Sequence, residues 1–205
     1  MRITESTNSE RQKSTEKTEA ILEGAMQEFL AHGYAATSMD RVAKAAGVSK
    51  ATVYSHFGDK EGLFNALIQA LAKDKFQTAI GLQESQSLAK DPKIVLRELA
   101  GKILDNAVND RTFQNFIRII IGESGRFPEL AKAYVNNLAK PAIEILTQYF
   151  KSHPELNLPD EEATVRIFMG SLIYYIMLQE LLHGKEIVPL ERDRLIDTLT
   201  HLITE

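Results

Sequence analysis

The chain of 205 residues contains no cysteine. Disulfide bonds, thiolate metal sites and a cysteine nucleophile are therefore excluded. No apolar stretch approaches the roughly 20 residues that a membrane-spanning helix needs. The polar N-terminus from Met1 to Lys17 does not resemble a secretory signal peptide. These absences suit a reducing cytoplasm, and we expect a cytoplasmic protein.

Basic residues are fewer than acidic ones, 24 against 28, which gives a formal net charge of -4. That balance argues against nucleic acid as a partner, because most DNA-binding proteins carry a basic footprint. The distribution is more informative than the total. Between Thr37 and Lys60 four basic residues face two acidic ones, which leaves a local charge of +2. A local patch of this kind can still meet phosphates.

Signals for β-structure are also few, because alternating β-branched runs and Asn-Gly turns are missing. Hydrophobic residues make up 44% of the chain, enough for a sizeable core. Apolar side chains recur with helical period, which predicts an all-α fold behind a disordered tail at 1–13. The predicted helices cover 14–32, 38–46, 50–57, 60–80, 92–109, 111–122, 128–152 with a kink at Pro141, 160–183, and 189 to the C-terminus.

Two of these helices are short and joined by a tight turn at Gly47, which is typical of a helix-turn-helix. In the second of them, 50–57, Val53 and Phe57 share one face and are expected to pack inward with Val48. The opposite face is small, polar and able to form hydrogen bonds, as contacts to bases and phosphates require. That face carries Ala51, Thr52 and Ser55, flanked by Lys50 and Tyr54 on one side and His56 on the other.

The stretch from Gly33 to Phe64 resembles the DNA-binding signature of the TetR (tetracycline-repressor) family. The matching residues are Gly33, Thr37, Val42, Ala43, Ala46-Gly47-Val48-Ser49, Thr52, Tyr54, His56-Phe57, Lys60-Glu61 and Leu63. The resemblance implies a three-helix helix-turn-helix domain over 14–62, a connecting helix over 63–80, and a larger helical domain over 81–205. It also implies DNA contacts from Ser38, Lys50, Thr52, Tyr54 and His56, and a phosphate contact at Lys60 and the start of its helix.

The family uses its C-terminal region for ligand binding and dimerisation, so both are expected here. Helix 160–183 is apolar on too many sides to be covered by its own subunit, and with 189–203 it predicts the contact between two subunits. We expect a small, largely apolar effector and no cofactor. The segment 122–130 is similar to a loop in one TetR subgroup and is interpreted as a helix-capping turn. The candidate pocket residues are Phe113, Phe116, Tyr134, Phe168, Met169 and Tyr174.

Two other functions remain open. Glu180 and His183 have the spacing of one half of a di-iron site, but the second half is missing, so we expect no enzyme and no metal. A helical adaptor that binds a protein through a vestigial helix-turn-helix is the other alternative. The sequence does not specify the operator, the regulated genes, the effector, or whether DNA binding represses or activates transcription.

Overall fold

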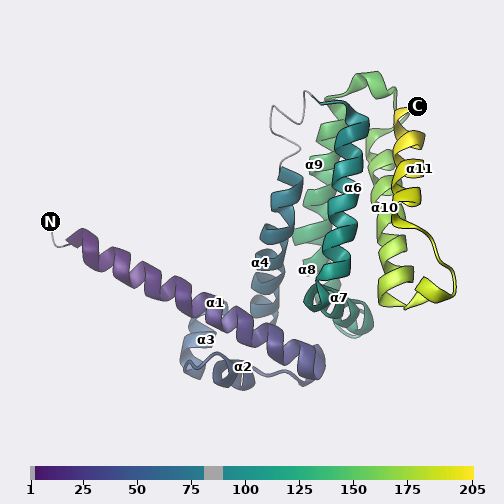
Figure 1. The fold of residues 1–205 in the computed structure, drawn as a ribbon. Helices are drawn as coiled ribbons and strands as arrows, with labels where there is room; N and C mark the ends of the chain where they lie inside the picture. The colour runs from purple at the N-terminus through teal and green to yellow at the C-terminus, as the bar shows by residue number, and fades with distance from the viewer. Residues whose placement is uncertain (1–2, 81–89) are drawn as a thin grey trace. The chain divides into compact units, whose positions relative to one another are not determined.

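The computed structural model describes the backbone of residues 3–80 and 90–205, and the side chains of 12, 14–73 and 90–205. Within these ranges the secondary structure is helical and holds no strand, which confirms the all-α class. No helix there combines the length and the apolar composition of a membrane span. The chain forms two compact units, Met1–Leu71 with Asn115–Tyr134, and Ala72–Gln114 with Val135–Glu205. Figure 1 labels the elements along the chain.

Unit 1 is the first of these units, and its helices follow the predicted order. Its elements are α1 (Ile3–Ala36), α2 (Met39–Ala45), α3 (Lys50–Phe57), the first part of α4 (Lys60–Ile80), most of α7 (Arg111–Glu123), and α8 (Pro128–Tyr134). α2 contacts both α1 and α3. The sequence placed 81–205 in one separate domain, whereas residues 115–134 pack in the same unit as the helix-turn-helix.

The start of α1 differs from the expected disordered tail, because the helix already begins at Ile3. Glycine and proline are both missing before Gly24, so no residue there interrupts the helical backbone. The predicted break at Gly33 is confirmed, since its φ of 73° is non-helical. Glycine adopts this left-handed backbone without the steric penalty that a Cβ atom brings.

An aromatic cluster forms the centre of the unit 1 core. Phe29 stacks on Tyr34 with ring centroids 5.6 Å apart, and Phe64 meets both rings edge-on at 5.4 Å. Phe116 of α7 stacks on Phe64 at 5.1 Å. On α4, Leu63 and Leu67 are also buried in this core. Edge-on and offset stacked ring pairs stabilise a core beyond the area that they bury.

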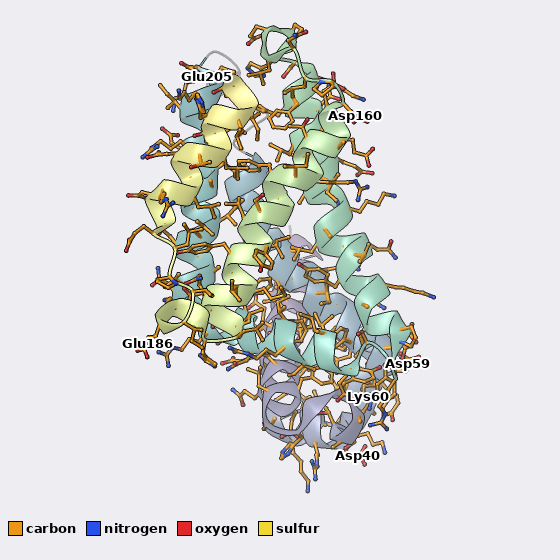
Figure 2. All side chains as sticks on the ribbon, turned by 90° about the vertical axis from the view of Figure 1, so that its right-hand side faces the viewer. Asp40, Asp59, Lys60, Asp160, Glu186 and Glu205 are labelled. Carbon is orange, nitrogen blue, oxygen red and sulfur yellow. The ribbon has the colours of Figure 1, made fainter. Side chains whose placement is uncertain are left out.

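Unit 2 is built around α10 (Glu161–Ile176), which contacts three other helices. These are α6 (Pro92–Asn109), α9 (Lys140–Lys151) and α11 (Arg192–Thr204). On α10, Val165, Phe168 and Leu172 are fully buried. Figure 2 shows Asp160 and Glu186 at opposite ends of this bundle, with the C-terminal Glu205 at the Asp160 end. The side chains of Phe76 and Ile80, which we expected to touch this domain, lie outside the described residues.

Two boundaries in unit 2 differ from the prediction. The single helix expected over 128–152 is divided, because a π-helical segment, Val135–Ala139, lies between α8 and α9. A proline lacks the N–H that a helix interior requires, so the widened turn fits its position. The last helix begins at Arg192 rather than Pro189. The Gln179 side chain donates to the Val188 carbonyl at 2.9 Å, which ties down the segment before Pro189.

Candidate nucleic-acid interface

The helix-turn-helix is fixed by two serine caps, one at the start of each helix. The Ser38 side chain accepts a hydrogen bond from Arg41 N at the start of α2, and the Ser49 side chain accepts one from Thr52 N at the start of α3. Each serine satisfies a backbone N–H that the first helical turn leaves without a partner. Gly47 has a positive φ of 66° in the turn between the two helices. Local chemistry thus determines both helix starts.

α3 has the two faces that the sequence predicted. Val53 is fully buried, and Phe57 and Val48 pack against the same core. On the other side Ala51, Ser55 and His56 are exposed, and Tyr54 keeps 44% of its surface accessible. Burying one face while exposing a small polar face is what a recognition helix in a major groove requires.

Hydrogen bonds within α3 hold part of this exposed face in place. The hydroxyls of Ser49 and Thr52 lie 2.8 Å apart, and the Ser55 hydroxyl donates to the Thr52 carbonyl at 2.9 Å. The same carbonyl lies 2.8 Å from Nδ1 of His56. A carbonyl oxygen only accepts, so Nδ1 is the donor in this hydrogen bond.

Lys50 does not extend freely from α3. Its Nζ lies 2.7 Å from Oδ1 of Asp40 on α2, and both side chains are more than half exposed. The hydrogen bond and charge of Asp40 raise the pKa of Lys50. The ammonium also lies 5.7 Å from the centre of the Tyr54 ring. The predicted DNA-contacting cation is therefore paired with a carboxylate in the unbound protein.

Lys60, the predicted phosphate contact, is held by backbone carbonyls in this structure. Its Nζ donates to the carbonyl oxygens of Tyr34, Ala35 and Thr37 at 2.8, 3.3 and 3.0 Å, and it lies 4.4 Å from the centre of the Tyr34 ring. Burial lowers the pKa of Lys60, while the charge of Glu123 opposes that shift. The ammonium caps carbonyls at the end of α1 in this structure, and its contact with a phosphate stays a prediction.

The segment Glu123–Leu130 joins α7 to α8, and sequence reasoning gave it only a capping role. It does cap α7, since Arg126 N and Phe127 N both donate to the Glu123 carbonyl. Its side chains, however, reach the helix-turn-helix. Glu123 Oε1 accepts hydrogen bonds from Tyr34 N at 3.1 Å and Ala35 N at 3.3 Å, and Phe127 meets the Tyr34 ring at 5.0 Å. These contacts span 88 or more residues of sequence, so no local pattern indicates them.

The candidate effector residues are divided between the two units. Phe116 and Tyr134 belong to the unit 1 core, whereas Phe168 and Met169 belong to the unit 2 core. Phe113 is half-buried on α7. Tyr174 is 59% exposed on α10. Their role in ligand binding stays a prediction.

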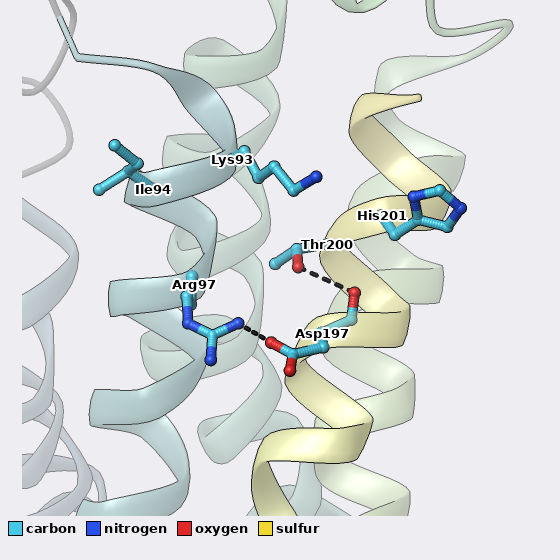
Figure 3. Close-up of a pocket in the computed structure, with 6 residues that line it drawn as sticks. All are labelled: Lys93, Ile94, Arg97, Asp197, Thr200 and His201. Atoms are coloured by element: carbon cyan, nitrogen blue, oxygen red, sulfur yellow. Dashed lines mark hydrogen bonds and ion pairs between the residues drawn. The ribbon is translucent and has the colours of Figure 1, made fainter.

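A surface pocket of about 400 Å³ lies between α6 and α11, and none of those residues lines it. Its lining consists of Lys93, Ile94, Arg97, Asp197, Thr200 and His201 (Figure 3). Arg97 pairs with Asp197, while Lys93 and His201 both pair with Glu205. The charged groups of the lining thus pair within the protein, and the place where an effector binds stays a prediction.

The alternative hypothesis, an enzyme with a di-iron site, gains no support from the Glu180 and His183 pair. Glu180 pairs with Lys185 at 2.8 Å, and His183 is exposed in a left-handed conformation after the π-helical segment Met177–Leu181. Across the described part of the chain, no three His, Cys, Asp or Glu side chains come together as a potential metal site.

The helix-turn-helix, with its capped helices and exposed polar face, defines a protein of the DNA-binding helix-turn-helix class.

Comparison with known proteins specifies the family. Residues 21–67 match the bacterial regulatory proteins of the tetR family, and residues 94–203 match the C-terminal domain of AefR-like transcriptional repressors. The second match alone covers more than half of the sequence. The chain belongs to the TetR family of transcriptional regulators, whose members bind DNA operators and act as dimers with small-molecule effectors.

Individual relatives agree with this assignment. The regulator AcrR of Shigella flexneri is 32% identical over 124 residues, which are 59% of this chain and 55% of AcrR, so the match spans about half of that protein. The flavonoid-responsive regulator FrrA is 30% identical with a TM-score of 0.65, over 90% of this chain and 91% of FrrA. A putative TetR-family regulator from Mesorhizobium loti shares the fold, with a TM-score of 0.73 and 24% identity over 93% of this chain and 96% of that one.

Proposed function

We propose that this protein is a sequence-specific transcriptional regulator that binds a near-palindromic operator as a homodimer. The observation that carries the proposal is α3, whose buried Val53 anchors a helix with an exposed polar face. Arginine, lysine and small polar side chains on such a face contact base edges and phosphates. The proposed DNA contacts are Ser38, Lys50, Ala51, Thr52, Tyr54, Ser55 and His56, together with the backbone N–H groups at the start of α4.

A two-fold dimer places its two recognition helices in successive major grooves about 34 Å apart or somewhat more. The experiment that tests DNA binding is selection from a pool of random duplexes with the full chain. The proposal predicts enrichment of a near-palindrome with two half-sites. It also predicts a steep loss of affinity with salt, because phosphate contacts release counterions. If no site is enriched, the adaptor alternative is favoured instead.

The proposed dimer interface is 160–183 with 189–203. α10 buries Phe168 inside its own subunit but leaves Ile167 63% exposed, and α11 leaves Leu202 72% exposed. Gly170 has open space where a Cβ atom would lie, so the backbone of a second helix can approach closely. Large apolar patches on a soluble protein mark interaction surfaces. Two helices from each subunit would form a four-helix bundle across the two-fold axis.

We further propose that a small, largely apolar effector releases the protein from its operator, so that the protein is a cytoplasmic repressor and not an enzyme. The support is the family and the relative FrrA, which is described as flavonoid-responsive. Linkage requires a true effector to bind the free and operator-bound protein with different affinities. Titration of apolar compounds should therefore change thermal stability and operator affinity together. Compounds that stabilise the protein without changing operator affinity would favour a constitutive DNA-binding protein.

A further inference from the structure

The turn between α1 and α2 is held by charged side chains from two directions. From α4, the Lys60 ammonium binds the carbonyl oxygens of Tyr34, Ala35 and Thr37. From the end of α7, the Glu123 carboxylate binds the N–H groups of Tyr34 and Ala35. The cation thus satisfies the acceptors of this short stretch and the anion satisfies its donors. Hydrogen bonds to charged groups are stronger than bonds between neutral groups.

Gly33 allows this close approach. A Cβ atom added at Gly33 would lie 3.0 Å from Glu123 Oε1, and the backbone there has a positive φ of 73°. The Thr37 hydroxyl donates back to the Gly33 carbonyl at 2.8 Å, which closes the turn. Ser38, the cap of α2, follows at once. The direction in which α2 leaves α1 is therefore set where Glu123 binds.

Apolar contacts from the same corner support the carboxylate. Phe127 packs edge-on against Tyr34, and Leu130 of α8 is fully buried in the unit 1 core. Residues 115–134 fall within the match to the C-terminal repressor domain, 94–203, yet they pack in the unit that contains the helix-turn-helix. The corner between α7 and α8 thus belongs to the matched C-terminal domain but packs against the end of α1 in the helix-turn-helix unit.

We propose that Glu123 is a positioning residue for DNA binding, which holds the α1–α2 turn so that α2 and α3 present the recognition face. The proposal rests on the DNA-binding function proposed above. Glu123 itself contacts no DNA in this account. A displacement of α7 is passed to the turn through the two N–H bonds, because packed elements shift between discrete arrangements rather than deforming continuously.

The test compares Glu123→Ala and Glu123→Gln with a control, Glu144→Ala, which removes an exposed carboxylate from α9. The first readout is amide hydrogen exchange of Tyr34 and Ala35 without DNA. The second is affinity for the selected operator over a range of salt concentrations, well below the melting temperature. Glutamine keeps an acceptor oxygen but loses the charge, so its effects should lie between those of wild type and alanine.

The proposal predicts faster exchange of these two amides in Glu123→Ala and an operator affinity lower by about 5-fold or more. The salt slope should stay as in wild type, because no phosphate contact is removed. Glu123→Gln should show smaller changes in the same directions, which keeps the test valid even if the alanine variant folds poorly. The control should match wild type in every readout.

Unchanged exchange in both variants would overturn the proposal, as would faster exchange with unchanged operator affinity. The second result would leave Glu123 as a stabilising contact only. In both cases the wild type still binds its selected site, so the failure concerns Glu123 and not DNA binding. If the wild type selects no site, the proposed function fails, and the positioning role fails with it.

Discussion

The Nζ atom of Lys50 lies 2.7 Å from Oδ1 of Asp40, so a cation of the recognition helix is paired with an acidic side chain of the preceding helix. Both side chains are exposed, and a pair of this kind contributes little to stability. Its consequence lies in binding, because Lys50 meets a phosphate or base only by leaving Asp40 or by bringing that negative charge close to the DNA.

Asp40→Asn is therefore expected to tighten DNA binding. The substitution frees Lys50 and removes a negative charge that faces the phosphates. Affinity for random duplexes should rise, and the slope of log affinity against log salt should steepen by about one if Lys50 gains one phosphate contact. Fluorescence anisotropy at several salt concentrations measures both. Glu23→Gln, which removes an exposed carboxylate from α1, is the control with the same change in net charge.

Lys60→Ala is expected to weaken the fold rather than a single phosphate contact. The substitution leaves carbonyl oxygens of Tyr34, Ala35 and Thr37 without their charged donor. The free energy of unfolding should fall by about 1–3 kcal/mol, as for other partly buried groups that lose a partner. Urea denaturation measures this. If the variant keeps the free energy of unfolding of the wild type, and the slope of log affinity against log salt falls by about one, Lys60 contacts a phosphate as the sequence suggested.

Ile167→Glu is expected to dissociate the dimer. Ile167 is 63% exposed in the single chain, so the charge costs little in a folded monomer but would be buried unpaired in the proposed interface. Light scattering at micromolar concentration should report a dimer for the wild type and a monomer for the variant. Ile94→Glu, at a half-exposed position on α6 outside the proposed interface, should stay dimeric. A monomeric wild type would contradict the assembly.

Tyr149→Phe is expected to stabilise the protein by about 1 kcal/mol, because an unpaired buried hydroxyl costs free energy that phenylalanine avoids. The Tyr149 hydroxyl is buried and lacks a hydrogen-bond partner. Burial is also the main reason why the pKa of Tyr149 is raised from 10.0 to about 12.

The raised pKa adds a dependence on alkaline pH. The unfolded phenol ionises near pH 10 and the folded phenol only near pH 12. The ionisation of Tyr149 therefore leaves the free energy of unfolding unchanged below pH 10 and lowers it as the pH rises to about 12. Tyr34 behaves in the same way, with a pKa of about 12. Chemical denaturation from pH 9 to 12 should show a shallower loss in Tyr149→Phe than in wild type. An equal loss of unfolding free energy in the variant and the wild type would contradict a raised pKa at Tyr149.

Features set by nearby residues could be predicted from the sequence. Ser38 and Ser49 cap helices through N–H groups only three residues away, and Gly33 breaks α1 through its own φ. The inward Val53 and the outward Ser55 follow from helical period alone. Such features need no knowledge of distant parts of the chain.

Features set by distant residues could not be predicted. The carbonyls that bind the Lys60 ammonium lie 23 to 26 residues earlier, so the sequence does not indicate these hydrogen bonds. The sequence indicates only a capping turn around Glu123, since its partners Tyr34 and Ala35 lie 89 and 88 residues away. The extension of α1 to Ile3 does not follow from composition, because a polar segment is also typical of a disordered tail, although no helix breaker interrupts it.

The central claim, that α3 reads DNA, is tested most directly by selecting binding sites with the wild type and with Thr52→Ala in parallel. The Thr52 side chain lies on the outer part of α3, where its methyl and hydroxyl groups are suited to a base edge. We predict that the wild type enriches a near-palindrome. In the variant, the preference for one base, at the equivalent position of both half-sites, should fall by about 1–3 kcal/mol. The account would be contradicted if the wild type enriched no near-palindromic site. It would also be contradicted if Thr52→Ala, and alanine variants of the other exposed α3 residues, all selected the same bases as the wild type.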